Sequence, residues 1–452
     1  MKKSLVALAA LAVVSAASAQ SSVTLYGVLD AAYNRLSATD AGVLSRVTGT
    51  GGNVASRIGF RGVEDLGGGL KASFVLEAGI NVDNGTGVAS PVNSTVLGQN
   101  LNFGTGVGGG NPLLLNPASS GAGLQGLTFN RRSTVSLEGG FGEIRVGRDL
   151  TPSFVNLAAF DPFTNVGVGS ALNVILGSLN PAGNSVAPPG SPKPQIRASN
   201  SIGYFTPSNL GGFYGQAMYA FSEVPTSCSA FGAVAAGGAG PNSCFGAKGD
   251  GKYLGLRGGY ANGPVNVAFG YGKTTYANDP TVPLGLFINN GVGAASQFRG
   301  NYTAVNLGGS YDFGVAKAMA QWGTQVQQAN LNQGFNSAGA VNAAALPQDQ
   351  KLTHYLLGVS VPVGAGEFKA SYNWGKVNSR ALIVDNERKQ NQLALGYVYN
   401  LSKRTAVYTS LSRLTASGLG ATATQALTSS AVTATSGNVT ATGYDIGIRH
   451  SF

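Results

Sequence analysis

The sequence predicts an all-β fold, a transmembrane barrel of sixteen antiparallel strands, and three observations support that prediction. Apolar and polar residues alternate with period two in segments of about ten residues throughout the chain after residue 20. Short turns and long polar connectors join these segments in alternation. Finally, 68 of the 452 residues are Gly and only 11% are charged, although 43% are apolar. A wall with one face toward lipid and one toward water has this composition.

The composition argues against an ordinary soluble enzyme, a coiled coil and an acidic disordered chain, since soluble domains contain about 25% charged residues. The only long apolar run is Leu5–Val14, which is shorter than the about 20 residues of a membrane-spanning helix. Lys2 and Lys3 precede this run and an A-x-A sequence, residues 17–19, follows it. We therefore expect residues 1–19 to be a cleaved signal peptide and residues 20–452 to form the barrel; a short membrane anchor is the alternative. Without Lys2 and Lys3, 27 basic and 19 acidic residues remain, a net charge of +8.

The alternation predicts the strands in chain order. They lie near residues 22–36, 54–64, 70–80, 129–138, 142–149, 196–206, 213–222, 252–261, 264–273, 302–311, 316–326, 354–362, 366–376, 391–399, 405–413 and 442–452. The long connectors are residues 81–128, 150–195, 223–251, 274–301, 327–353, 377–390 and 414–441. Seven short turns alternate with these long connectors, so the pattern predicts up-and-down hairpins whose two ends face different compartments.

The last strand shows the alternation most clearly. Tyr444, Ile446 and Ile448 fall on one face, and Asp445 and Arg449 on the other. Such a sheet must close on itself in a membrane, because an unpaired backbone group in hydrocarbon costs several kcal/mol. The alternative is a soluble β-sandwich or a solenoid. The polar strand faces are as substantial as the apolar ones, and the Gly-rich loops have no fixed repeat, which favours the barrel.

Several motifs resemble those of one known family. They are Ser22–Asp30 at the mature start, Ser56–Gly62 with its following Glu64–Gly67 turn, Phe141–Arg148, Phe160–Phe163, Arg197–Tyr204 and the terminal Phe452. Together they are similar to general porins of Gram-negative outer membranes, of the beta-proteobacterial type, over the whole mature chain. Connectors 81–128 and 414–441 are long for that family, so loop functions are not carried over.

The resemblance implies a homotrimer in the cell outer membrane that lets small hydrophilic solutes and ions diffuse passively. It also implies short periplasmic turns, long extracellular loops and a third loop folded into the lumen to form the constriction. Phe452 resembles the signal read by the outer-membrane assembly machinery. The alternative function is a barrel specific for one solute or ligand.

Charged side chains that face each other across a narrow aqueous gap select ions. Arg57, Arg132 and Arg197 fall on the non-lipid face of their strands and match basic wall positions of the family pattern. Lys71 and Arg145 share that parity and are further candidates. Arg148 has the opposite parity at a strand end, where a bulge would turn it inward. The alternative is a hydrated wall without a selective role.

The candidate acids opposite these residues are Asp161 on the third loop and Asp149 at its base. No charged residue occurs between Pro162 and Pro192. A loop so poor in acids, facing several arginines, indicates an anion-preferring pore.

Cys228 and Cys244 lie in the connector 223–251, and an exported protein meets an oxidising compartment. We expect them to form a disulfide; a reduced pair is the alternative.

His354 and His450 are the only histidines and are far apart in sequence, so no metal site is expected. Enzyme signatures are missing, which predicts no catalytic residue and no cofactor. Basic residues are dispersed singly, so no nucleic acid partner is expected.

Overall fold

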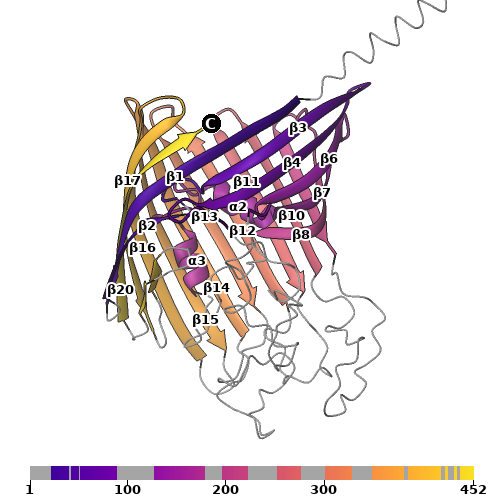
Figure 1. The fold of residues 1–452 in the computed structure, drawn as a ribbon. Helices are drawn as coiled ribbons and strands as arrows, with labels where there is room; N and C mark the ends of the chain where they lie inside the picture. Colours follow the sequence, from indigo (N-terminus) through magenta and orange to yellow (C-terminus); the bar gives the residue numbers. More distant parts are fainter. Residues whose placement is uncertain are drawn as a thin grey trace, which may run out of the picture.

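The structure, a computed structural model, is a closed antiparallel β-barrel (Figure 1). It describes residues 22–39, 42–49, 51–88, 127–178, 196–221, 252–275, 301–327, 349–380, 385–418, 423–425, 432–434 and 438–452. Its main sheet contains eighteen strands, of which β2 and β5 are short additions and the other sixteen form the wall. The last wall strand pairs with both its predecessor and the first strand, which closes the barrel.

The wall strands follow one another in chain order. They are β1 (Ser22–Ala38), β3 (Arg57–Gly67), β4 (Leu70–Asn81), β6 (Arg132–Gly139), β7 (Gly142–Leu150), β8 (Arg197–Phe205), β9 (Phe213–Ala220), β10 (Lys252–Asn262), β11 (Val265–Thr275), β12 (Asn301–Asp312), β13 (Lys317–Gln327), β14 (Asp349–Val363), β15 (Gly366–Arg380), β16 (Asp385–Asn400), β17 (Thr405–Ser417) and β20 (Asn438–Ser451). All sixteen predicted strands are confirmed. Strands β14, β15 and β16 extend several residues beyond the predicted ends, toward the long connectors.

The two faces of each strand have different surroundings. On β11, Val267 and Phe269 are 44% and 45% exposed, whereas Ala268 between them is 3% exposed. Outward-facing leucines, valines and aromatics on the other strands are exposed in the same way, since only lipid covers them in a membrane. The inward face carries amides and hydroxyls together with small residues. Among the described residues, no helix is long and apolar enough to cross a membrane.

Two consecutive strands, β2 and β3, pair with different halves of β1. Strand β2 (Gly42–Thr48) pairs with the second half of β1, and β3 pairs with its first half. Residues 49–56 separate them. Asp30 on β1 accepts hydrogen bonds from Asn53 N and Val54 N, at 3.1 and 2.6 Å, and from the Tyr408 hydroxyl. The sequence pattern did not predict β2. Two further short pieces are β5 (Thr86–Gly87), which pairs with β4, and the hairpin of β18 (Ala423–Gln425) and β19 (Val432–Ala434).

The segment after β7, in the connector expected to be the third loop, packs against the wall strands. It contains α2 (Pro152–Ala159) and α3 (Leu172–Ser178), which lie within the barrel outline in Figure 1. Thr151 caps α2 by accepting a hydrogen bond from Phe154 N, and Pro152 occupies the first turn, where its missing N–H costs nothing. Helix α2 contacts β10, β11 and β12, and α3 contacts β14, β15 and β16. The loop therefore lies against one side of the lumen.

Candidate functional site at the constriction

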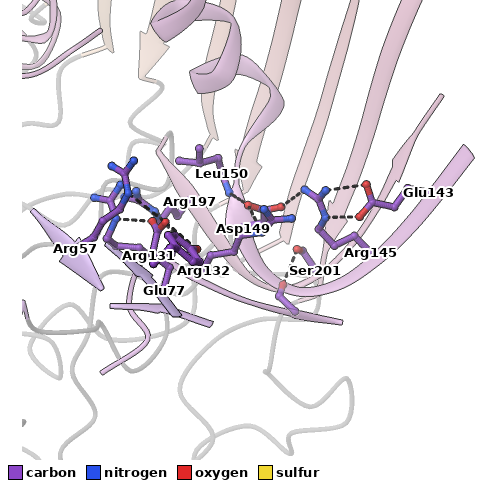
Figure 2. A network of polar contacts seen from close by, with 12 residues as sticks. Arg57, Glu77, Arg131, Arg132, Glu143, Arg145, Asp149, Leu150, Arg197 and Ser201 are labelled. Carbon is purple, nitrogen blue, oxygen red and sulfur yellow. Dashed lines mark hydrogen bonds and ion pairs between the residues drawn. The ribbon is translucent and has the colours of Figure 1, made fainter. Parts of the chain in front are cut away.

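The wall opposite the third loop carries a dense cluster of charged side chains. Figure 2 shows most of this cluster along neighbouring strands. We call it the arginine cluster; it comprises Arg57 on β3, Glu77 on β4, Arg131 just before β6, Arg132 on β6, Glu143, Arg145, Arg148 and Asp149 on β7, and Arg197 on β8. Six guanidinium groups and three carboxylates leave a formal excess of three positive charges.

Glu77 organises one end of the arginine cluster. Its carboxylate pairs with Arg131 Nε at 2.6 Å and with Arg57 Nε at 3.3 Å, and it accepts a hydrogen bond from the Tyr26 hydroxyl at 3.2 Å. Glu77 also lies directly opposite Arg132 in the register of β4 and β6. One carboxylate thus holds two guanidinium groups at the wall and partly offsets their charge.

Asp149 and Glu143 organise the other end. Arg145 binds Asp149 at 2.5 Å and Glu143 at 2.8 Å, and its guanidinium lies 4.0 Å from the centre of the Phe205 ring. Asp149 also faces Arg132 Nε at 3.6 Å. Because two carboxylates surround Arg145, its charge contributes little to the field in the lumen.

Arg148 and Arg197 are held by uncharged groups. Arg148 donates to the carbonyl oxygen of Asn130 at 2.6 Å and to the Ser199 hydroxyl at 2.7 Å. Arg197 donates to the carbonyl oxygen of Arg131 at 2.8 Å. In the part of the chain that the structure describes, neither forms an ion pair with a carboxylate. These two residues therefore carry much of the excess positive charge.

A β-bulge explains how Arg148 comes to face the cluster. The register of β7 and β8 shifts between Gly147 and Asp149, which changes the side on which the following side chains emerge. Gly147 adopts a φ of 124°, and a Cβ there would collide with the carbonyl oxygen of Ser133. Glycine is thus required at this position.

The third loop presents almost no charge to the cluster. Asp161 is the only charged residue between Leu150 and Ser178, and it is 2% exposed. Its carboxylate accepts hydrogen bonds from the backbone N–H groups of Phe163, Asn165 and Ala171 at 2.9 to 3.1 Å. Burial raises the pKa of the Asp161 carboxyl, while these three donors oppose the rise. The carboxylate expected to face the arginines is instead enclosed by the backbone of its own loop.

Inward-facing amides hold the loop in place. Asn156 Nδ2 donates to Asn306 Oδ1 at 2.6 Å, and Gln321 Nε2 donates to the carbonyl oxygen of Leu157 at 2.6 Å. Farther along the loop, Val168 N donates to Asp445 Oδ2 at 3.0 Å. These bonds link the loop to β12, β13 and β20.

The predicted site residues are brought together only in part. Arg57, Arg132, Arg145, Arg197 and Asp149 meet in the arginine cluster. Lys71 lies near the turn between β3 and β4, opposite Asp65 and Glu138 in the register.

Sequence reasoning missed Glu77, Arg131 and Glu143 as members of the cluster. The alternation in the sequence places Glu77 on the polar face of its strand, but the residues that it contacts depend on the register between strands. Arg131 lies just before β6, so the alternation along that strand does not determine the direction of its side chain.

Other sequence predictions concern residues away from the cluster. Cys228 and Cys244 and the signal peptide, residues 1–19, lie outside the described residues, so both remain predictions. Phe452 exchanges backbone hydrogen bonds with Gly27, both at 3.1 Å, where the chain end meets β1. Within the described ranges, no three His, Cys, Asp or Glu side chains converge as a metal site requires.

Comparison with known proteins places this geometry in a family. The family model for Gram-negative porins matches residues 6–419. The chain is 34% identical to outer membrane porin protein 32 of Delftia acidovorans over the full length of both, and 28% identical to an outer membrane porin of Bordetella pertussis, covering 90% of this chain and 93% of that one. A solved structure of an anion-selective porin from Comamonas acidovorans is 32% identical and matches with a TM-score of 0.63, covering 96% of this chain and all of that one. The chain therefore belongs to the Gram-negative porin family and forms a channel in the outer membrane.

Proposed function

We propose that this porin prefers anions and that the preference arises at the arginine cluster. The observation that supports the proposal is an excess of three positive charges on the wall, opposite a loop whose only acid is buried. A similar protein, the Comamonas porin, is described as anion-selective. The substrates are small hydrophilic solutes and ions that diffuse passively.

The physical basis is electrostatic. A narrow aqueous gap with low-dielectric walls focuses the field of the charges that line it, which raises the local concentration of counter-ions. Arg148 and Arg197 hydrogen-bond only to uncharged groups. The carboxylates that act on Arg197 without contacting it, Glu77 and Asp149, are each paired with other arginines. The positive charge of the cluster attracts a passing anion, and a cation gains no corresponding carboxylate from the loop.

The double variant R148Q/R197Q tests the proposal. It removes two positive charges, and the chloride-to-potassium permeability ratio in planar bilayers should fall several-fold. The matched control is K403Q/R404Q, which removes two positive charges from the exposed turn between β16 and β17 and should leave the ratio unchanged. Equal ratios for wild type and R148Q/R197Q would place the selectivity elsewhere.

We also infer that the channel works as a homotrimer without enzymatic activity, cofactor or metal, and that the assembly machinery reads its terminal Phe452. Membership of the family and the exposed apolar wall support the trimer, and the exposed Phe452 at the barrel seam supports the signal. Migration on unheated gels reports the trimer directly. The alternative of a solute-specific barrel would show itself as saturable block of conductance by one solute.

A further inference from the structure

One further arginine faces the lumen outside the arginine cluster. Arg257 lies in the middle of β10, five residues from each end of the strand. Leu254 and Leu256, on the other face of β10, are both 45% exposed, whereas Tyr253, on the same face as Arg257, is 2% exposed. Helix α2 packs against β10 from inside the barrel. Arg257 therefore points into the lumen beside the third loop.

Two neighbouring side chains fix the direction of the Arg257 guanidinium. Its Nε donates to Asn156 Oδ1 on α2 at 3.1 Å, and its Nη2 donates to the Tyr214 hydroxyl on β9 at 3.2 Å. The guanidinium carbon also lies 4.7 Å from the centre of the Tyr214 ring. This ring is itself held, because it packs over Gly259, where a Cβ would collide with it, and because its hydroxyl donates to Asn266 Oδ1 at 2.8 Å.

The groups that hold Arg257 are uncharged. They are one amide oxygen and one phenol, and within the described part of the chain no carboxylate forms an ion pair with Arg257. Arg145, in contrast, is bound by two carboxylates. Arg257 therefore carries a positive charge that its own partners fix in place but do not offset.

The strand register separates Arg257 from Arg197 of the arginine cluster. Gln216 on β9 lies opposite both Arg257 on β10 and Phe205 at the end of β8. Arg197 lies eight residues from Phe205, at the other end of β8, which is about 26 Å along the strand. Phe205 comes just before the short turn between β8 and β9, whereas Arg197 follows the long connector. Arg257 is thus displaced from Arg197 toward the short turns.

We propose that Arg257 is a further selectivity-determining residue of the channel, which attracts permeating anions on the short-turn side of the arginine cluster. The proposal rests on the anion preference proposed above and assigns part of it to a residue outside the cluster. The field of a fixed charge that no carboxylate offsets raises the concentration of anions over that of cations in this part of the lumen. The hydrogen bond to Asn156 places that charge beside α2, on the side of the lumen where the third loop lies.

The alternative role of Arg257 is to support α2 through Asn156 without acting on ions. The two roles depend on different properties of the side chain. A support needs the hydrogen bonds to Asn156 and Tyr214, whereas attraction of anions needs the positive charge. Attraction by charge is also screened by salt, since the Debye length falls from about 10 Å at 0.1 M to about 3 Å at 1 M ionic strength.

Reversal potentials of three variants in planar bilayers of neutral lipid separate the two roles. R257Q and R257M remove the charge, and the chloride-to-potassium permeability ratio of each should fall about twofold at about 0.1 M potassium chloride, as expected for a unit charge about 8 Å from the ion. The difference from wild type should shrink at about 1 M salt. R257K keeps the charge without the planar guanidinium that reaches both partners, and its ratio should stay close to that of wild type.

The matched control is K273Q, which removes one positive charge from the outward face of β11, the face of Val267 and Phe269, and should behave like wild type. Unchanged ratios in R257Q and R257M would overturn the proposal. An equal fall in R257K and R257Q would also overturn it, because the hydrogen bonds rather than the charge would then be responsible. If the wild-type channel itself preferred potassium, the anion preference proposed above would fail, whereas a further shift toward potassium in R257Q but not in R257K would still support the role of Arg257.

Discussion

The six arginines of the arginine cluster differ in the groups that bind them, and this difference determines how much positive charge each one contributes. Arg145 is bound by two carboxylates, whereas Arg148 and Arg197 donate to carbonyl and hydroxyl oxygens. A guanidinium beside a carboxylate adds little field at a distance, since the two charges nearly cancel. The proposed selectivity thus depends on the balance of charge rather than on the number of arginines.

Glu77 is the residue at which this balance can be changed most simply. The E77Q variant removes one negative charge beside Arg57 and Arg131. A unit charge acting on an ion at about 8 Å in water contributes about 0.5 kcal/mol, so the chloride-to-potassium permeability ratio should rise roughly twofold. Reversal potentials measure the ratio. The control is E64Q near the short turn, and an unchanged or lower ratio in E77Q would contradict the charge-balance explanation.

The D161N variant tests whether Asp161 lines the pore or stabilises the third loop. In D161N, an amide with one acceptor oxygen replaces a carboxylate that accepts three backbone N–H bonds. Leaving buried donors unsatisfied costs about 1–3 kcal/mol, so the loop should loosen and channel noise should increase. Anion preference should stay close to wild type because the carboxylate is buried. A clear rise in anion preference without added noise would show that Asp161 faces the pore.

At the scale of elements, the third loop depends on amides that project from the wall against which it lies, such as Asn306 on β12. Asn306 accepts from Asn156 Nδ2 at 2.6 Å and donates to the carbonyl oxygen of Ser153 at 3.1 Å. The N306A variant leaves buried polar groups of α2 without these partners, at a cost of about 1–3 kcal/mol.

Single-channel recordings of N306A should therefore show more frequent conductance fluctuations than wild type. The control is T303A, on the same strand but on its outward face. Recordings of N306A as quiet as those of wild type would indicate that other contacts suffice to hold the loop.

The strands could be predicted from the sequence because one face of each strand contacts lipid and the other contacts water. Alternation survives along the whole strand when one side meets lipid and the other meets water, as Val267, Ala268 and Phe269 show on β11. Strand β2 was not predictable, because the break between β2 and β3 depends on hydrogen bonds from residues 53 and 54 to the distant Asp30. Helix α2, in contrast, carries a visible start signal in Thr151 followed by Pro152.

The sequence predicted those site residues whose direction follows from the alternation of polar and apolar residues along a strand. Parity placed Arg57, Arg132 and Arg145 in the lumen, and these residues lie in the arginine cluster. Parity gave no partners, because partners depend on register and on a bulge at Gly147 that only the backbone reveals. It also could not show that Asp161 is buried, since the donors that surround it come from the loop backbone.

At the scale of the whole molecule, only 11% of the residues are charged because the outer face of the barrel contacts lipid and is mostly apolar. The lipid-facing wall is apolar over most of its height, and the arginine cluster concentrates positive charge on the inner face, where we propose that it acts on solutes that cross the channel.

The proposed anion preference can be measured as the reversal potential of the wild-type channel under a potassium chloride gradient. Purified protein is inserted into a planar bilayer of neutral lipid, so that the lipid contributes no charge, and the potential at zero current is recorded. An excess of three positive charges at the constriction predicts a potential displaced toward the equilibrium potential of chloride. A potential displaced toward the equilibrium potential of potassium would show that the channel prefers cations.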